Sequence, residues 1–330
     1  MKVHRDLTEL LPIGNKTVVT IGTFDGVHLG HRQIIAQLKS EAAKIGGETV
    51  IITFDPHPRK IISSVPGEVK LLNTLEEKIM LLEAAGIDHL VVVRFDHQFA
   101  NQSAEQYIHD FLFTTFHPHT VIIGYDHRFG KGRVGDYHLL KTFGEKLGFE
   151  VKEISEQLSN EIVISSTKIR HAIIDTDMLT ANTFLGYPYF FEGIVVEGNK
   201  VGRTIGYPTA NLHISTEDKL VPGNGVYAVT VKSLAFGFWG MGLDFKDIYS
   251  GDSINHLQGM MNIGFRPTVD GKKRVIEVNI FGFDKDIYGE VLQVFVHHYI
   301  REEIKFTGLD TLKIQLEKDK QAAKTYLEKF

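Results

Sequence analysis

The chain of 330 residues contains no cysteine, a single tryptophan and nine prolines. The absence of cysteine excludes disulfide bonds, thiolate metal sites and a cysteine nucleophile. No apolar run approaches the length of about 18 residues that a bilayer-spanning helix needs. Residues 1–9 are charged and no apolar segment follows them, so the sequence lacks the pattern of a secretion signal. These absences predict a cytoplasmic protein without a membrane partner.

A basic excess is also missing. The chain has 36 lysine and arginine residues against 41 aspartate and glutamate residues, and its net charge is −5. A duplex nucleic acid or an anionic lipid surface needs a basic patch or tail, so neither is expected as a partner. The hydrophobic fraction of 43% is ordinary for a globular protein, and the 31 glycines suit several tight ligand loops.

The first half of the chain alternates short apolar strands with amphipathic helices. Two capping boxes, which begin at Thr74 and Ser103, mark helix starts. Strands are expected at 18–21, 49–54, 89–93, 120–123 and 151–154, and helices at 33–43, 75–85, 104–113 and 137–147. Repeated β-α-β units imply a parallel sheet with helices on both faces. Ligands bind at the carboxyl ends of such strands, so segments 22–31, 55–58 and 124–136 should meet at one rim.

The pattern changes near Phe184, where strands joined by glycine-rich turns replace the long helices. These strands are expected at 189–196, 226–232, 260–264, 275–281 and 291–299, and they predict an antiparallel barrel or sandwich. Residues 309–328 return to helical spacing, with one apolar face: Leu309, Leu312, Leu316, Ala323 and Tyr326. We therefore predict two domains, residues 1–183 and 184–330.

One decapeptide, Gly22–His31 (GTFDGVHLGH), lies between the first buried strand of this pattern and the first long helix. Backbone N–H groups and the positive end of a helix dipole bind anions at such a turn. His28 and His31 are three residues apart, so both lie on one side of the first helical turn. A phosphate-handling site is the chemistry that this arrangement favours.

The decapeptide resembles the HxGH motif of the nucleotidyltransferase superfamily, whose members transfer a nucleotide from its triphosphate to an acceptor phosphate. Residues 165–170 (SSTKIR) resemble the superfamily's downstream SSTxIR signature. The resemblance implies that His28, His31 and Arg170 assist catalysis by stabilising charge on phosphate oxygens. It also implies a nucleotide-binding set made of Gly22, Phe24, Asp25, Gly26, Gly30, Ser166 and Thr167.

Residues 124–132 (GYDHRFGKG) resemble the loop that receives the flavin nucleotide in bacterial FAD synthetases. The resemblance implies flavin contacts by Asp126, Arg128 and Lys131, the two cations being suited to a phosphate. Many members carry Asn and Phe where this chain has Asp126 and His127, so the roles of those two positions stay open. The segment 55–58 (DPHP) resembles a rim segment of the same family and is expected to set loop shape.

A second long signature occurs in the other predicted domain. Residues 202–212 (GRTIGYPTANL) resemble the GRxxGxPTANL signature of riboflavin kinases, and the sequence has no Walker A loop. The resemblance implies nucleotide contacts by Gly202, Arg203, Gly206 and Pro208. It also implies that Thr209 and Asn211, a hydroxyl and an amide oxygen, are the ligands of Mg²⁺ bound to ATP.

The strand at 275–281 alternates: Ile276, Val278 and Ile280 share the face predicted for the core, and Glu277 and Asn279 share the other. In riboflavin kinases the glutamate of this strand is the general base for the ribityl hydroxyl, which implies that role for Glu277. The family often has His at the position of Asn279, to which no chemistry is assigned. The NIGxRPT-like segment 262–268 and the segment 301–306 imply flavin contacts by Asn262 and Arg301.

The segment 233–256 is longer than the hairpin that the family usually has at this place in the chain. It contains Trp239 among other aromatic residues. It is interpreted either as a surface excursion or as a lid or subunit contact.

The resemblance covers nearly the whole chain, in the motif order of bifunctional bacterial FAD synthetases. It implies a Rossmann-like nucleotidyltransferase domain followed by a Greek-key riboflavin kinase barrel with a terminal helix. The expected reactions are phosphorylation of riboflavin to FMN by ATP and adenylyl transfer to FMN, which gives FAD and pyrophosphate, both with Mg²⁺. A monomer or weak homo-oligomer is expected. Two alternatives are a nucleotidyltransferase with another phosphate acceptor and a flavin-binding regulatory protein.

Overall fold

The computed structural model describes residues 1–7, 16–62, 69–124, 127–154, 164–233, 256–268 and 271–329. Its contacts divide the chain into two compact units, Met1–Ser165 and Ser166–Phe330. The predicted positions Asp126 and 234–255 lie outside the described residues.

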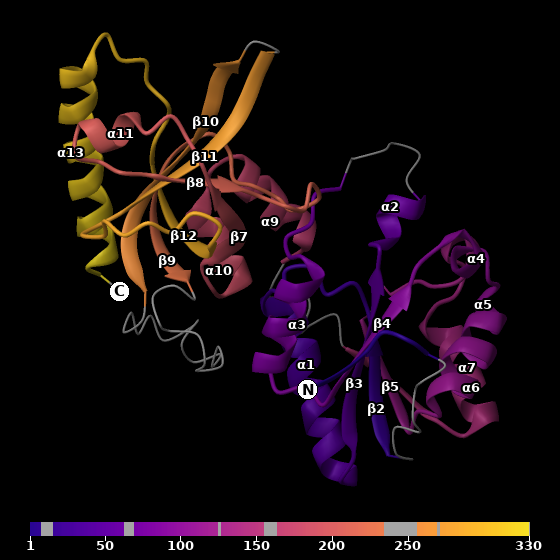
Figure 1. Cartoon of the computed structure of the whole chain (residues 1–330). Helices are drawn as coiled ribbons and strands as arrows, with labels where there is room; N and C mark the ends of the chain where they lie inside the picture. Colours follow the sequence, from indigo (N-terminus) through magenta and orange to yellow (C-terminus); the bar gives the residue numbers. More distant parts are fainter. Residues whose placement is uncertain are drawn as a thin grey trace. The chain divides into compact units, whose positions relative to one another are not determined.

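The first unit is built on a six-stranded sheet in the order β1-β4-β3-β2-β5-β6, in which every pair is parallel (Figure 1). Its strands are β1 (Lys2–His4), β2 (Thr17–Ile21), β3 (Glu48–Asp55), β4 (His89–Arg94), β5 (Thr120–Gly124) and β6 (Glu150–Ile154). The predicted parallel sheet and its five strands are confirmed. The short edge strand β1 was not predicted, because three residues carry too little periodicity.

Helices cover both faces of this sheet (Figure 1). They are α1 (Leu29–Ile45), α2 (Pro58–Ile62), α3 (Leu75–Ala84), α4 (His97–Ala100), α5 (Ala104–Gln106), a π-helix (Tyr107–Phe113), α6 (Thr114–Phe116), a 3₁₀ turn (Lys131–Arg133) and α7 (Tyr137–Leu147). Odd-numbered residues of β2, Val19 and Ile21, pack in one core with Ile108 and Phe111 of the π-helix and Leu140 of α7. Both predicted capping boxes are present, at Thr74 and Ser103.

Strands β3, β2 and β5 are neighbours, so the segments that follow them leave the sheet side by side at its carboxyl edge. These segments are the predicted ones: 22–31 after β2, 55–58 after β3 and 124–136 after β5. The sequence prediction of one shared rim is confirmed by this topology.

The second unit contains a closed antiparallel barrel in the order β10-β11-β8-β7-β12-β9 (Figure 1). Its strands are β7 (Tyr189–Val196), β8 (Ala210–His213), β9 (Gly225–Ser233), β10 (Leu257–Thr268), β11 (Gly271–Ile280) and β12 (Val291–Arg301). Closure decides between the two predicted architectures in favour of the barrel. Ile276, Val278 and Ile280 are buried as their alternation predicted.

The described helices of this unit are α9 (Ser166–Ile174), α10 (Met178–Leu185), α11 (Val201–Thr204) and α13 (Leu309–Leu327). The contact division places α9 and α10 with the barrel, whereas the sequence predicts a boundary between 183 and 184, which stays a prediction. Asn182 of α10 explains the grouping. Its amide donates to the Val296 carbonyl at 3.0 Å, and its carbonyl accepts from the Tyr189 N–H at 2.8 Å.

The terminal helix α13 corrects the apolar face predicted for it. Leu309 is 55% exposed, whereas Asp319 is buried together with Ala323 and Leu327. An acidic side chain is buried here because the Arg301 guanidinium binds both its oxygens, at 2.8 and 2.6 Å. Hydropathy spacing does not register such a pair, since it scores each residue alone.

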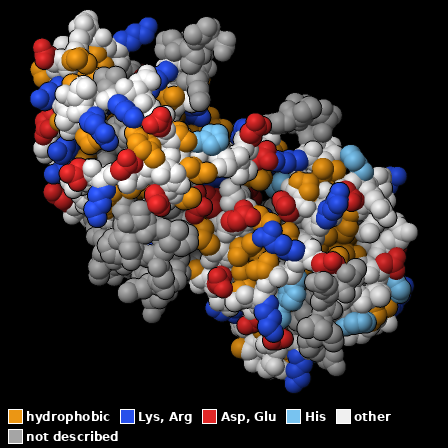
Figure 2. Space-filling view, in the orientation of Figure 1, with side chains coloured by type: hydrophobic (Ala, Val, Ile, Leu, Met, Phe, Trp, Pro, Cys, Tyr) orange, Lys and Arg blue, Asp and Glu red, His pale blue; other side chains and the backbone are white. Residues whose placement is uncertain are grey.

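Acidic and basic side chains are interspersed on the surface seen in Figure 2. Across the described part of the chain, none of the helices is both long enough and apolar enough to cross a bilayer.

Candidate functional site

In the first unit, the loop between β2 and α1 brings the two motif histidines into contact. His28 is the N-cap of α1, and its Nδ1 accepts from the His31 backbone N–H at 3.4 Å. The two imidazole rings stack with centroids 3.7 Å apart and an interplanar angle of 15°. The motif therefore places two imidazoles beside the N–H groups that begin a helix of 17 residues.

The same loop is held in a strained backbone conformation. Phe24 and Val27 have φ angles of 47° and 34°, in the left-handed region that favours glycine, and Gly26 between them has a φ of 88°. A β-branched residue such as Val27 costs on the order of 1–3 kcal/mol in this region. Phe24 and Val27 are nonetheless almost completely buried, so packing holds the loop in this shape. Strain of this kind is typical of ligand-binding loops.

Buried polar side chains hold the loop in place. The Asp25 carboxylate, 1% exposed, accepts backbone N–H bonds from Leu72 at 2.9 Å and Asn73 at 3.2 Å. Lys78 of α3 is buried as well, and its ammonium donates to the Thr53 hydroxyl at 3.2 Å. Asp25 was predicted to bind nucleotide; here it fastens segment 72–73 to the loop. Lys78 was missed, because a lysine inside an amphipathic helix usually faces water.

These buried groups set the charge of the site. Burial lowers the pKa of His31 well below its usual 6.5, and the nearby His28 and Lys78 lower it further. Burial also lowers the pKa of Lys78, whereas the carboxylates Asp25 and Asp55 raise it in part. His31 is therefore neutral at pH 7 without a ligand. An anion beside it would favour the protonated imidazole.

The other predicted residues of this site lie on separate elements. Arg128 and Lys131 are exposed on the loop after β5. That loop is tight, because Phe129 and Gly135 exchange two backbone hydrogen bonds, at 3.2 and 3.0 Å. The motif residues Ser166, Thr167 and Arg170 lie in α9, which begins the second unit.

In the barrel, three polar residues lie in one row across neighbouring strands. Glu277 of β11 pairs in register with Asn262 of β10 on one side and with Asn211 of β8 on the other. Directly opposed residues of antiparallel strands point to the same face, with Cβ atoms about 5 Å apart. The predicted base, one predicted flavin contact and one predicted metal ligand are therefore neighbours.

Glu277 has two further contacts. Its Oε1 pairs with the Arg266 guanidinium at 2.5 Å and accepts from the Thr209 hydroxyl at 3.5 Å. Glu277, Asn262, Arg301, Gly202 and Thr209, all predicted site residues, line one cavity of about 370 Å³ with Arg266. Arg266 was not assigned a role from the sequence, where it is one position of a turn-like segment.

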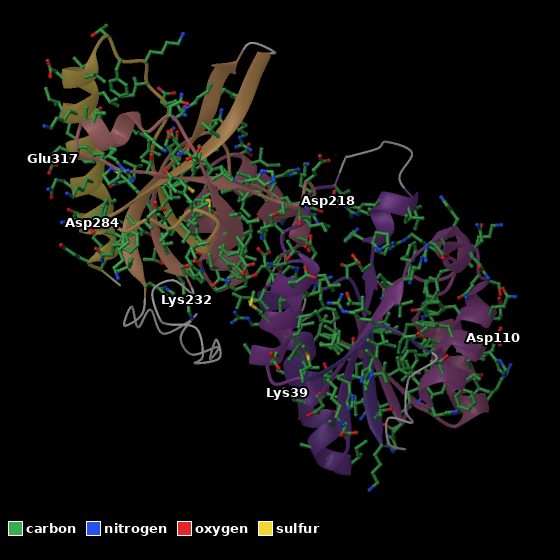
Figure 3. The ribbon with its side chains drawn as sticks, viewed as in Figure 1. Lys39, Asp110, Asp218, Lys232, Asp284 and Glu317 are labelled. Carbon is green, nitrogen blue, oxygen red and sulfur yellow. The ribbon has the colours of Figure 1, made fainter. Side chains whose placement is uncertain are left out.

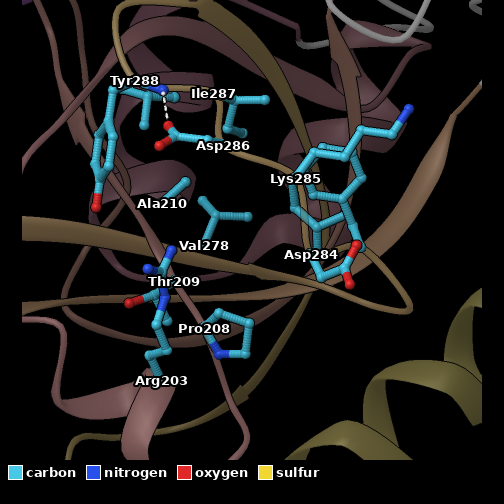
Figure 4. Close-up of a pocket in the computed structure, with 13 residues that line it drawn as sticks. Arg203, Pro208, Thr209, Ala210, Val278, Asp284, Lys285, Asp286, Ile287 and Tyr288 are labelled. Carbon is cyan, nitrogen blue, oxygen red and sulfur yellow. Dashed lines mark hydrogen bonds between the residues drawn. The ribbon is translucent and has the colours of Figure 1, made fainter.

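A second cavity, of about 510 Å³, is lined by Arg203, Pro208 and Thr209 together with the segment 283–288 (Figure 4). Thr209 therefore lines both cavities. The Asn279 amide, to which the sequence gave no chemistry, donates to the Pro208 carbonyl at 2.7 Å and fixes the backbone before Thr209. Gly202 is required for a different reason: a Cβ there would lie 2.2 Å from the Tyr207 carbonyl oxygen.

Helix α13 braces both the glycine loop and the last strand. The Tyr207 hydroxyl donates to Glu317 of α13 at 2.6 Å (Figure 3 labels Glu317). Burial and the Glu317 carboxylate raise the pKa of Tyr207 to about 12, so the hydroxyl stays protonated. Arg301, predicted to contact flavin, is held by Asp319, so its donors are partly used and its guanidinium is fixed against the cavity.

The donor set fits Mg²⁺ bound to a nucleotide better than a protein-held metal ion. The described residues contain no group of three or more His, Cys, Asp or Glu side chains arranged to hold a metal. Thr209 and Asn211 offer hard neutral oxygens beside the Glu277 carboxylate. Mg²⁺ takes few protein ligands when phosphates supply the remainder.

A strained loop with two histidines at the start of a helix and a carboxylate-bearing cavity on a barrel fit a nucleotide-using transferase with two sites. Comparisons with known proteins agree. The family model for FAD synthetase matches residues 12–168, and the model for riboflavin kinase matches residues 185–327. The chain belongs to the bifunctional riboflavin kinase/FMN adenylyltransferase family.

Two curated relatives with that name are from Haemophilus influenzae and Listeria monocytogenes. The first is 37% identical and the match covers 99% of each chain; the second is 38% identical over 95% of this chain and 93% of the relative. A crystal structure described as a macrolide-efflux protein from Streptococcus pneumoniae has a TM-score of 0.80, 29% identity and 98% coverage of both chains. That similarity supports the two-part fold described above.

Proposed function

We propose that the barrel unit phosphorylates riboflavin with ATP and that the sheet unit adenylylates the FMN that results. The observation that carries the proposal is the row Asn211–Glu277–Asn262, with Thr209 at 3.5 Å from Glu277. The Glu277 carboxylate lines the cavity of about 370 Å³, and Thr209 lines that cavity and the second one, so one cavity can hold a nucleotide and the other a flavin.

In the first reaction, Glu277 accepts the proton of the ribityl 5′-hydroxyl as its oxygen attacks the γ-phosphorus of ATP. The new O–P bond forms, the bond between the γ-phosphorus and the β-bridging oxygen breaks, and ADP leaves. Arg203 and the segment 202–209 would bind the nucleotide phosphates, and Asn262 and Arg301 would contact flavin. Asn279 and Tyr207 position the glycine loop through Pro208 and α13.

Mg²⁺ is expected with ATP, and when bound it neutralises phosphate charge and orients the γ-phosphate. Thr209 and Asn211 would hold it, with the nucleotide supplying the other oxygens. Asn211 pairs in register with Glu277 and the Thr209 hydroxyl lies 3.5 Å from its carboxylate, so both proposed ligands are next to the proposed base.

In the second reaction, a phosphate oxygen of FMN attacks the α-phosphorus of ATP, the α–β phosphoanhydride bond breaks and pyrophosphate leaves. His28, His31 and the N–H groups that begin α1 would stabilise the added negative charge. The motif residues Ser166, Thr167 and Arg170 are proposed nucleotide contacts, and Arg128 and Lys131 are proposed contacts of FMN. Since both reactions use ATP, we place the enzyme in the cytoplasm.

A time course of products from riboflavin, ATP and Mg²⁺ tests the proposal. We expect FMN to appear first and FAD with pyrophosphate to follow. The alternative adenylyl acceptors are tested by pyrophosphate release with pantetheine phosphate or nicotinamide mononucleotide in place of FMN. Release with one of these but not with FMN would overturn the assignment of the sheet unit, and binding of flavin without turnover would indicate the regulatory alternative.

A further inference from the structure

The side chain of Asn73 is a buried amide without a hydrogen-bond partner in the part of the chain that the structure describes. Its side chain is 2% exposed, and within the described residues neither Oδ1 nor Nδ2 makes a hydrogen bond. Buried side-chain amides are nearly always satisfied, because each unmade hydrogen bond keeps the desolvation cost of its group. An amide left with both atoms unpaired is expected where a ligand completes it.

The position of Asn73 indicates which ligand. Its backbone N–H donates to the Asp25 carboxylate at 3.2 Å, which fastens Asn73 to the loop 22–31. Asp25 and Lys78 interact electrostatically, and so do Lys78 and His31. His31 Nδ1 is also buried without a hydrogen-bond partner among the described residues. Among the described residues, unpaired polar atoms are thus found on Asn73 and on His31, beside the loop that begins α1.

We propose that the Asn73 amide contacts substrate in the adenylyltransferase site, donating from Nδ2 to a phosphate oxygen and accepting at Oδ1 from a neighbouring hydroxyl. ATP and FMN both carry a phosphate ester next to hydroxyl groups, so this chemistry is shared by the two substrates. Asp25 and Lys78 are positioning residues: Asp25 holds the Asn73 backbone, and Lys78 holds β3 through Thr53. The inference rests on the function proposed for the sheet unit.

The test uses the full chain and the substitution Asn73→Leu, which keeps the branched shape and removes both polar atoms. A merely structural amide would lose stability on this change. A substrate contact instead loses activity while the free enzyme keeps or gains thermal stability, because two unpaired groups have been removed. We expect kcat/KM for FAD formation from FMN to fall at least about tenfold, with an unchanged or higher Tm.

Separate titrations of ATP and FMN identify the source of the phosphate: the substrate that Asn73 contacts shows the raised KM. Riboflavin phosphorylation, which is assigned to the barrel unit, should stay within about twofold of the native chain, and the Tm reports whether the sheet unit is folded. If Asn73→Leu does not fold, Asn73→Ala, which introduces no new bulk, answers the same question.

Thr17→Val is the matched control. Its hydroxyl is also buried without a partner among the described residues, but Thr17 begins β2, at the opposite end of the strand from the loop 22–31. FAD formation by this variant should match the native chain.

Native kcat and KM for both substrates in the Asn73 variants would overturn the inference, as would an equal loss in Thr17→Val. If instead the native chain makes no FAD from FMN, the function proposed for the sheet unit fails.

Discussion

The Arg266 guanidinium lies 2.5 Å from the Glu277 carboxylate, across two neighbouring strands of the barrel. Arg266 is four residues beyond Asn262 on β10, so both side chains leave the strand on the face that carries Glu277. Arg266 and the Thr209 hydroxyl both contact Oε1 of the proposed base, so we expect a substrate hydroxyl to approach Oε2.

Replacement of Arg266 by Gln should lower kcat for riboflavin phosphorylation about tenfold to a hundredfold, because the carboxylate loses the charged group that orients it. Steady-state kinetics with riboflavin and ATP measure this. Lys keeps the charge but not the forked geometry of the guanidinium. The kcat of Arg266→Lys should therefore lie between those of the native chain and of Arg266→Gln. FAD formation from supplied FMN is the control and should be unchanged. A native kcat in Arg266→Gln would show that the pair orients nothing.

The hydrogen bond from Asn279 to the Pro208 carbonyl predicts a selective effect on ATP. Asn279→Leu leaves that carbonyl unpaired, which costs about 1–3 kcal/mol of stability and loosens the backbone before Thr209. We expect the kinase KM for ATP to rise several-fold and its KM for riboflavin to change less. The exposed Asn101 offers a control, since Asn101→Leu removes a surface amide. Equal rises in both KM values would contradict this account.

Loss of the buried Lys78 ammonium near the loop 22–31 should weaken adenylyl transfer to FMN only. Lys78→Met keeps the length of the side chain and removes its charge. The triphosphate then loses electrostatic attraction, and the KM for ATP in FAD formation should rise about tenfold. The Tm of the variant verifies that the sheet unit is folded, and kinase activity in the same preparation should be native. If FAD formation by Lys78→Met equals that of the native chain, Lys78 serves only to fill the core.

The barrel should lose stability in acid through His297 of β12. Burial lowers the pKa of His297 to about 4, with a further contribution from His256, and its Nε2 lies 2.9 Å from the Thr230 hydroxyl. Between pH 6.5 and about 4 the unfolded chain takes up a proton that the folded chain does not. Stability therefore falls as the pH falls through this window, by up to about 3 kcal/mol.

Unfolding in urea from pH 7 to pH 4 measures this effect. His297→Gln should show a flatter dependence of stability on pH, because the titrating ring is gone. Replacement of the exposed His138 by Gln should leave the native slope. The same slope in His297→Gln and the native chain would show that other groups cause the loss in acid.

Local sequence patterns predicted most of the fold because each predicted element has its own periodicity. Capping residues at Thr74 and Ser103 fixed two helix starts, and alternation fixed the buried face of β11. The short strand β8 has four residues and was not predicted, since its hydrogen bonds to β7 and β11 come from distant parts of the chain. Barrel closure depends on the same long-range pairing and is not visible in any one segment.

For the candidate sites, the sequence predicted the residues of the motifs but not the residues that support them. Motif residues such as His28 and Glu277 were found because their spacing is distinctive. Lys78, Asn73 and Arg266 were not, because burial and partners decide their roles and the sequence does not encode these locally. Arg301 illustrates the difference. Its motif predicted a flavin contact, whereas its ion pair is with Asp319, which lies in α13 and 18 residues further along the chain.

The most direct test of the two-site account is product analysis of the Glu277→Gln variant, supplied first with riboflavin and then with FMN. With ATP and Mg²⁺, we expect the variant to make neither FMN nor FAD from riboflavin, yet to convert FMN to FAD at the native rate. FMN formation from riboflavin at the native rate would contradict the role of Glu277 as the base. An equal loss of both reactions in a folded variant would contradict the assignment of the reactions to separate sites.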